Sequence, residues 1–323
     1  MKKVVSMAAV AAFSVAAGYW MGWRQSPLTL PLPRPARSYA EALAKIEALA
    51  AHDAGLVNPV CRSQVRHHGR VTPHAVVLIH GFTNCPAQFA ALGEEFFHRG
   101  DNVVIVRLPR HGFTHSHVDE LKRLTAEELL ASASAAVDIA CGLGERVVVM
   151  GLSLGGLLAG WQAQLRGDVD QAVLIAPALN FFTVPARWQP LYARVLSWWP
   201  SFFYWWDPVA KAQGAGPAHA YPGFYTAGFA QVLRLGLLLQ RTAHQRAPRA
   251  RALVVVTNPC DEAVDNRGAA ALTHAWRSHG ATVTEHAFAA EWGLPHDLID
   301  PAQPDQQVAR VYPQLIEWLT ADA

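Results

Sequence analysis

The sequence predicts an α/β fold in which helices flank a mostly parallel central sheet. From about residue 71 onward, short apolar runs alternate with longer segments of helical periodicity, which is the order of elements expected for a parallel sheet. With 51% hydrophobic and only 16% charged residues, the chain of 323 residues can bury a sizeable core, which argues against disorder. A net charge of +2 without a long basic block argues against nucleic acid as the main partner.

The N-terminus resembles a targeting segment. Residues 4–23 contain no charged side chain and end at Arg24, and a run of this length can span a bilayer as a helix. A cleavable signal peptide with a small-residue site near Ala16 is the competing interpretation. Tyrosine and tryptophan near the end of the run favour an uncleaved anchor. We therefore assign residues 1–25 to a signal peptide or N-terminal membrane anchor. We expect an exported protein, secreted or membrane-anchored and facing the periplasm or exterior.

Residues 26–57 are expected to form a proline-rich linker followed by a helix. Four prolines fall between residues 26 and 35, which makes this stretch a stiff spacer. Residues 38–51 combine good helix formers with leucine and isoleucine at helical spacing. The main domain is expected over residues 58–323, and its first, edge strand at residues 61–68.

The core elements follow in order along the chain. Apolar runs bounded by turn residues predict strands at residues 75–79, 103–106, 147–150, 172–175, 253–256 and 282–288. Helical periodicity predicts helices at residues 86–100, after Thr125, after Ser153 and at residues 308–319. Thr125 and Glu128 have the spacing of a capping box at the start of their helix.

The apolar run 147–150 leads directly into the pattern Gly151-Leu152-Ser153-Leu154-Gly155. Read as strand, sharp turn and helix, the pattern would force strained backbone angles on Ser153. Glycines are needed at both ends of this turn because side chains there would clash. The serine hydroxyl would then stand clear of the sheet at the positive end of the next helix. An ordinary glycine–serine turn between strand and helix is the alternative.

Five motifs occur in a fixed order, each where a predicted strand ends. They are His80-Gly81-Phe82-Thr83, Pro109-Arg110-His111-Gly112, Gly151 to Gly156, Asp261-x-x-Val264 and His296. In this order and placement, residues 71–323 resemble bacterial carboxylesterases of the monoacylglycerol-lipase-like branch of the α/β-hydrolase superfamily. The resemblance implies an α/β-hydrolase fold with a helical cap inserted after the sixth strand. It also implies a serine hydrolase acting on carboxylic esters.

A serine hydroxyl becomes a nucleophile only beside a base that a third group orients. His296 is the best base for Ser153 because it lies in a Gly/Pro-containing loop after the last strand, whereas His286 lies within that strand and is expected to pack there. Asp261 is the best orienting carboxylate because it follows a strand at its carboxyl end, and the resemblance favours it. Asp265 is the runner-up and is otherwise a helix cap.

Acyl transfer also needs donors for the developing oxyanion. The backbone N–H of Leu154, directly after Ser153, is one candidate donor. The resemblance supplies the backbone N–H of Phe82 as the other. Together with the candidate catalytic residues, these two N–H groups complete the predicted site.

No cofactor or metal is expected. The glycine-rich segment 151–156 lacks the lysine and spacing of a P-loop and is not a dinucleotide fingerprint. His111, His115 and His117 lack a matching pair of carboxylates, so we expect solvated loop histidines there rather than a metal site.

Between about residues 178 and 250 the alternation of strands and helices stops. This segment is rich in aromatic residues, namely Trp188, Trp198, Trp199, Phe202, Phe203, Tyr204, Trp205 and Trp206. We interpret it as a cap whose apolar wall would suit acyl chains. Two alternatives remain open, since the rings could instead form the cap's own core or dock on a membrane. We expect most rings to be buried inside the cap, one or two to reach substrate, and residues 229–239 to form a cap helix.

Cysteine usage suggests one disulfide. Cys61 and Cys85 flank the first central strand, and in an exported protein a bond between them would brace the loop after that strand. Four cysteines allow three pairings, so Cys141 and Cys260 are not excluded as partners.

The favoured function is hydrolysis of a small-molecule hydrophobic ester through Ser153, His296 and Asp261, with an acyl-enzyme intermediate. An acyltransferase or a small-amide hydrolase with the same three residues is one alternative. A non-catalytic, membrane-tethered binding protein is another. Substrate identity, chain-length preference and oligomeric state are left open by the sequence.

Overall fold

The computed structural model describes residues 28–53, 57–113, 115–205 and 217–321. The predicted targeting segment, residues 1–25, lies outside the described residues. The chain from Pro31 onward forms one compact unit. Within the described ranges, no helix is both long and apolar enough to cross a membrane.

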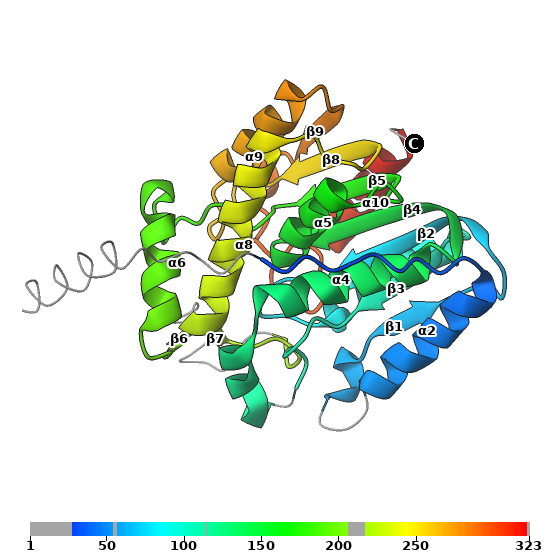
Figure 1. Ribbon diagram of the computed structural model, residues 1–323, viewed down its shortest axis with the longest axis horizontal. Helices are drawn as coiled ribbons and strands as arrows, with labels where there is room; N and C mark the ends of the chain where they lie inside the picture. The colour runs from blue at the N-terminus through cyan, green and yellow to red at the C-terminus, as the bar shows by residue number, and fades with distance from the viewer. Residues whose placement is uncertain (1–27, 54–56, 114, 206–216, 322–323) are drawn as a thin grey trace, which may run out of the picture. The chain divides into compact units, whose positions relative to one another are not determined.

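A seven-stranded sheet with the order β1-β3-β2-β4-β5-β8-β9 forms the centre of this unit (Figure 1). Its strands are β1 (Gln64–Arg66), β2 (Thr72–Ile79), β3 (Asn102–Val106), β4 (Gly144–Leu152), β5 (Gln171–Ile175), β8 (Ala252–Thr257) and β9 (Val283–Ala287). The short edge strand β1 pairs antiparallel with β3, and the other strands pair in parallel. The predicted mostly parallel sheet is confirmed. The inner strands β2, β4 and β5 are apolar over most of their length, because helices cover both faces of the sheet.

The helices form a layer on each face of the sheet (Figure 1). On one face lie α3 (Ala90–His98) and α10 (Val308–Ala321), which share a core with strand side chains such as Leu78 and Val254. The other face is covered by α4 (Ala126–Ala140), α5 (Leu154–Leu165) and α9 (Arg267–Ser278), and α2 (Tyr39–His52) packs on α4. This is the covered parallel sheet that the alternation of elements predicts, and it agrees with the α/β-hydrolase fold that the resemblance implies.

Side-chain caps mark the start of two helices. The Ser38 hydroxyl accepts a hydrogen bond from the Glu41 N–H at the start of α2. Thr125 and Glu128 form the predicted capping box at the start of α4. The helix predicted at residues 86–100 is divided into a 3-10 turn, η2 (Pro86–Phe89), and α3. Tight turns of this kind are common where a helix begins.

The insertion between β5 and β8 combines helices with a β-hairpin. Its main elements are α6 (Gln189–Trp198), β6 (Phe203–Trp205), β7 (Gly223–Tyr225) and α8 (Thr226–Gln245). The antiparallel pairing of β6 with β7 was not predicted. The insertion follows the fifth strand of the sheet in chain order rather than the sixth, because the chain before β2 contributes only β1 to the described sheet.

The expectation that most cap aromatics are buried is wrong for the described residues. Four tryptophans are between 38% and 64% exposed, namely Trp188, Trp198, Trp199 and Trp205. The cap's own small core is built instead from the buried residues Val184, Ala193, Phe229 and Leu233. Among them, Ala193 of α6 packs with Phe229 and Leu233 of α8 where the two helices meet.

Candidate active site

Three of the sequence-predicted residues lie at one edge of the sheet. Ser153 directly follows β4, Asp261 follows β8 after a short turn, and His296 lies in the loop after β9. The three strands run parallel, so their carboxyl ends share this edge. The fold therefore brings together residues that are far apart in the sequence.

Ser153 occupies the strained turn that its flanking glycines predict. Its backbone angles are φ 58° and ψ −114°, a region that residues other than glycine rarely adopt. A Cβ atom at Gly151 would overlap the backbone of Gly155, and a Cβ atom at Gly155 would overlap the carbonyl of Ile79. Both glycines are thus sterically required. The turn places Ser153 at the N-cap of α5, where the helix dipole favours negative charge.

Asp261 and His296 are joined by a hydrogen bond. Nδ1 of His296 lies 2.7 Å from Oδ2 of Asp261, whose side chain is fully buried. The other carboxylate oxygen of Asp261 accepts from the backbone N–H groups of Ala263 and Val264. These bonds fix the carboxylate, which in turn fixes the imidazole with Nδ1 as donor and Nε2 directed elsewhere.

The runner-up carboxylate has a different role. Asp265 accepts hydrogen bonds from the guanidinium and the backbone N–H of Arg267, and no described contact joins it to His296. The Arg267 side chain lowers the pKa of Asp265. His286, the alternative base, stacks its ring on Trp318 of α10 at 4.6 Å, away from the turn that holds Ser153. It is the packed strand residue that the sequence predicts.

Ser153 and His296 share the edge of the sheet but are not hydrogen-bonded to each other. Among the described residues, no hydrogen bond links the Ser153 hydroxyl to the imidazole of His296. Such contacts are often long in unliganded enzymes and tighten when substrate binds. The pair of His296 and Asp261 is therefore formed, and Ser153 lies at the same edge of the sheet without a described hydrogen bond to it.

Two hydrogen bonds to the backbone of Gly81 hold the loop after β2. Nδ1 of His80 donates to the carbonyl oxygen of Gly81 at 2.8 Å, and the N–H of Gly81 donates to Oε1 of Gln88 at 2.8 Å. Because the carbonyl and N–H of one peptide plane point in opposite directions, this bond turns the N–H of Phe82 away from His80. Within the described part of the chain, neither Phe82 nor Leu154 has a hydrogen-bond acceptor for its N–H. Both candidate oxyanion donors are available.

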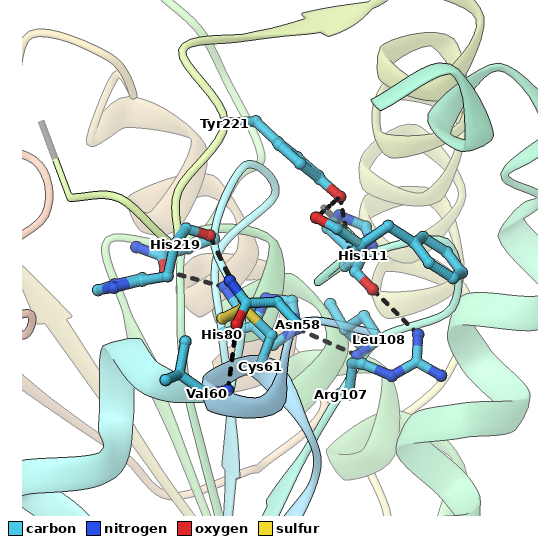
Figure 2. Close-up of a disulfide and its surroundings, with 12 residues drawn as sticks. Asn58, Val60, Cys61, His80, Arg107, Leu108, His111, His219 and Tyr221 are labelled. Atoms are coloured by element: carbon cyan, nitrogen blue, oxygen red, sulfur yellow. Dashed lines mark hydrogen bonds between the residues drawn. A yellow bond between two sulfur atoms is a disulfide. The ribbon is translucent and has the colours of Figure 1, made fainter. Parts of the chain in front are cut away.

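Two buried histidines, both labelled in Figure 2, make hydrogen bonds at this loop. Nε2 of His80 accepts from the N–H of Leu108, and Nε2 of His111 lies beside the carbonyl oxygen of Phe82. The expectation that His111 is a solvated loop residue is wrong, since its ring is fully buried. Burial lowers the pKa of His80 well below its ordinary value and lowers that of His111 to about 4. Both rings are therefore neutral packing groups at pH 7.

A disulfide braces the same loop. Cys61 and Cys85 are bonded, with their Cα atoms 5.2 Å apart, which confirms the suggested pairing (Figure 2). Cys85 directly precedes η2, whose Gln88 side chain holds the N–H of Gly81. Cys141 and Cys260 are free. The cross-link fixes the start of η2 and so the loop that carries Phe82.

The side chain of Asn258 joins the turn before Asp261 to the loop that carries His296, a contact that was not predicted. The buried amide of Asn258 donates to the carbonyl oxygens of Leu294 and Pro295, at 2.9 Å and 3.1 Å. Its carbonyl oxygen accepts from the N–H of Cys260, directly before Asp261. One side chain thus sets the spacing between the carboxylate and the imidazole. In the sequence, Asn258-Pro259 indicates only a turn, because its partners lie in another loop.

A second carboxylate lies beside the candidate base. Asp297 follows His296 and accepts hydrogen bonds from the side-chain amides of Asn84 and Gln303. Burial raises the pKa of Asp297. Burial also opposes protonation of His296, but the charge of Asp261, its hydrogen bond and the charge of Asp297 together raise the pKa of His296 above the ordinary 6.5. Asp297, which is not one of the three residues predicted from the sequence, therefore contributes to the raised pKa of His296.

This shift predicts the pH dependence of any reaction that uses His296 as a base. Only the neutral imidazole can accept a proton, so activity should be lost as pH falls through a pKa above 6.5. Asp297→Asn keeps an acceptor oxygen but removes the charge, so the acidic limb of kcat/KM should move to lower pH. Asp305→Asn, an exposed change in the same region, is the matched control and should not move it. An unchanged limb in Asp297→Asn would contradict this assignment.

The described residues hold no group of three or more His, Cys, Asp or Glu side chains suited to a metal ion. A cavity of about 290 Å³ opens at the opposite, amino end of the strands, where His74, Val148 and Gln171 line it. It lies away from Ser153 and does not belong to the candidate site.

Comparisons with known proteins agree with this architecture. The sequence profile of the alpha/beta hydrolase family matches residues 76–311. A thermostable monoacylglycerol lipase from Bacillus sp. (strain H-257) is 30% identical over 114 residues, which cover 35% of this chain and 44% of that protein. The chain therefore matches less than half the length of this curated relative.

Two solved structures share the fold. One comes from work on LipS and LipT, two metagenome-derived lipolytic enzymes, with a TM-score of 0.63 at 18% identity, over 82% of this chain and 99% of the other. The monoacylglycerol lipase of Paleococcus ferrophilus gives a TM-score of 0.55 at 18% identity, over 81% and 98%. At these identities the likeness concerns the fold alone.

Proposed function

The chain belongs to the alpha/beta hydrolase family, and within it we propose a serine hydrolase that cleaves carboxylic ester bonds of hydrophobic acyl substrates. The observation that carries this proposal is the 2.7 Å hydrogen bond between His296 and the buried Asp261, at the same sheet edge as the strained Ser153. A buried carboxylate on Nδ1 leaves Nε2 as the free base. This is the arrangement that a serine nucleophile needs.

The reaction follows from these positions. Oγ of Ser153 attacks the ester carbonyl carbon while Nε2 of His296 takes the hydroxyl proton. His296 then returns the proton to the leaving alcohol, and an acyl-serine ester remains. A water molecule then attacks this ester while Nε2 of His296 takes one of its protons. His296 passes that proton to Oγ of Ser153 as the acyl–oxygen bond breaks, which releases the carboxylic acid and restores the free enzyme. Asp261 stabilises the imidazolium in both halves.

The negative oxygen of each tetrahedral intermediate would be held by the N–H groups of Phe82 and Leu154. A single donor of this kind typically contributes about 3 kcal/mol to transition-state stabilisation. The bonds of His80 and Gln88 to Gly81 hold the loop before the substrate arrives. Little reorganisation is then needed during the reaction.

The preference for hydrophobic acyl groups rests on the cap. The ring of Phe82 lies 5.4 Å from that of Phe224 and 6.5 Å from that of Phe229, both in the insertion. Phe181 adds a further ring at 4.9 Å from Phe229. An apolar cluster therefore adjoins the candidate oxyanion loop, which suits an alkyl or aryl group. The partial match to a monoacylglycerol lipase supports the same substrate class.

Covalent labelling tests the proposal directly. A fluorophosphonate should modify the native chain at Ser153, because only an activated serine attacks phosphorus at neutral pH. Peptide mapping locates the adduct, and prior heat denaturation should abolish it. Hydrolysis of p-nitrophenyl esters of increasing chain length should be lost in parallel with labelling. A native chain that neither labels nor hydrolyses any ester of the panel would favour the non-catalytic binding protein.

A further inference from the structure

The cavity at the amino end of the strands has a mostly apolar floor and apolar walls. The floor is one row of side chains across β2, β4, β5 and β8, formed by Val76, Val148, Gln171 and Ala252. Phe96 of α3 and Leu319 of α10 line it from the helix layer. The row thus belongs to the face of the sheet that packs on these two helices, and about 290 Å³ is left open there.

Gln171 is the one polar residue in this row. The next positions of β5 on the same face are Val173 and Ile175, which belong to the apolar core. Gln171 is only 7% exposed, and its Nε2 atom meets no acceptor among the described residues. A buried N–H without an acceptor costs free energy, so such groups normally have a partner. Because the last torsion of a glutamine is soft, the amide can turn toward an oxygen atom in the cavity.

Charged side chains surround the mouth of the cavity. Two carboxylates there are already paired with cations, namely Asp170 with Arg251 at 2.8 Å and Asp101 with His74 at 3.3 Å. Arg146 also lines the cavity, and its guanidinium forms no hydrogen bond or ion pair within the described ranges. It lies two residues before Val148, the register partner of Gln171, so Arg146 and Gln171 are diagonal neighbours on one face of the sheet. The unpaired polar groups of the cavity are therefore both donors.

We propose that this cavity binds a small carboxylate with an apolar body, such as the anion of a medium-chain fatty acid. The carboxylate oxygens would accept from the guanidinium of Arg146, whose planar fork matches them, and from the amide of Gln171. The hydrocarbon chain would lie on Val76 and Val148, against the ring of Phe96. An apolar pocket with a few convergent polar groups is the usual form of a small-molecule site. A cationic ligand is disfavoured, because both carboxylates of the mouth already have partners.

The acid that the proposed ester hydrolysis releases has the chemistry of this ligand. The cavity and the nucleophile lie at opposite ends of β4, since Val148 precedes Ser153 by five residues, roughly 16 Å at the rise of a strand. A carboxylic acid in the cavity would therefore occupy a site separate from the one in which it is formed. This consequence rests on the proposed function, whereas the binding itself depends only on the cavity.

Calorimetric titration of the full chain with sodium octanoate tests the proposal. Octanoate should bind saturably, and two related compounds separate the parts of the site. Octan-1-ol keeps the chain but lacks the carboxylate, so it should bind at least about tenfold more weakly. Acetate keeps the carboxylate but lacks the chain, and each buried methylene contributes about fourfold to the affinity, so acetate should not bind detectably.

Variants locate the bound octanoate. Val148→Phe places a ring in the cavity and should abolish binding, so its titration also measures any uptake outside the cavity. Arg146→Gln should weaken binding by about tenfold or more. Its matched control is Arg70→Gln, an exposed arginine before β2 that does not line the cavity, and this change should have no effect. Gln171→Met keeps the length of the side chain but removes the amide. It should weaken binding without lowering the Tm, because an unpaired buried group is lost.

Three outcomes would overturn the proposal. The first is a titration with octanoate that does not saturate by about 10 mM, which is too weak for a formed site. The second is saturable binding that persists unchanged in Val148→Phe and Arg146→Gln, which would place the acid elsewhere on the chain. The third is octan-1-ol binding as tight as that of octanoate. Hydrolysis of p-nitrophenyl butyrate by the parent chain is measured in parallel, and its absence would contradict the proposed function without affecting the titration.

Discussion

Replacing Ser153 with alanine should lower kcat for activated esters by at least about 10³-fold while the fold is preserved. The hydroxyl is the nucleophile in the proposed reaction, and no other described group at this sheet edge replaces it. Alanine accepts the same backbone strain as serine, so the Tm should stay close to the parental value. The N–H donors of Phe82 and Leu154 remain, and they account for the residual rate.

Steady-state kinetics with p-nitrophenyl butyrate measures this effect, with Ser278→Ala on α9 as the matched control. In the described part of the chain, the hydroxyl of that serine bonds within its own helix, to the carbonyl of Ala275, and its loss should leave kcat unchanged. Near-parental activity in Ser153→Ala would place the nucleophile elsewhere. Equal losses in both variants would point to misfolding rather than chemistry, and circular dichroism would distinguish the two.

Replacing His296 with alanine should also lower kcat by about 10³-fold or more, because residues of one catalytic unit are lost together rather than additively. Alanine removes the base and leaves the buried carboxylate of Asp261 without its partner. The labelling rate of Ser153 by fluorophosphonate should fall in the same proportion. A modest drop in Tm is expected from the unpaired carboxylate.

The chain offers a matched control in His286. Its ring stacks on Trp318 and belongs to the packing of β9 on α10. His286→Ala should therefore lower the Tm but leave kcat and its acidic limb in place. If instead His286→Ala abolished activity and His296→Ala retained it, the base would have to be moved into the last strand.

The sequence located the candidate nucleophile without help from the structure. Gly151 and Gly155 predict the turn because a Cβ atom at either position is sterically forbidden, and this constraint acts between residues only a few positions apart. The capping box of Thr125 and the order of strands and helices are local in the same sense. Constraints between residues close in the chain appear as residue types at fixed spacings, so they can be recognised from the sequence alone.

The candidate site was predictable only in part. The sequence favours Asp261 and His296 because each follows a strand and, for Asp261, because of the resemblance. The structure brings Nδ1 of His296 to 2.7 Å from Oδ2 of Asp261. Asn258 and Asp297, which position and tune the imidazole, carried no signal in the sequence. Their roles arise from partners in other loops, and the distances between loops depend on how the whole sheet twists and packs.

The glycine turn and the alternation of apolar runs were thus determined by the sequence itself, since each depends on neighbours along the chain. The burial of His111, the exposure of the cap tryptophans and the hairpin of β6 and β7 were decided by the tertiary structure. Whether an aromatic ring is buried depends on which surface the fold leaves for it. The face of α6 that contains Gln189 and Ala193 is buried. Trp188 and Trp199, the residues that flank this helix, are exposed. Both faces of α6 are apolar enough to pack on α8. Which of them does so depends on how the whole core packs, and the sequence of the helix alone does not determine it.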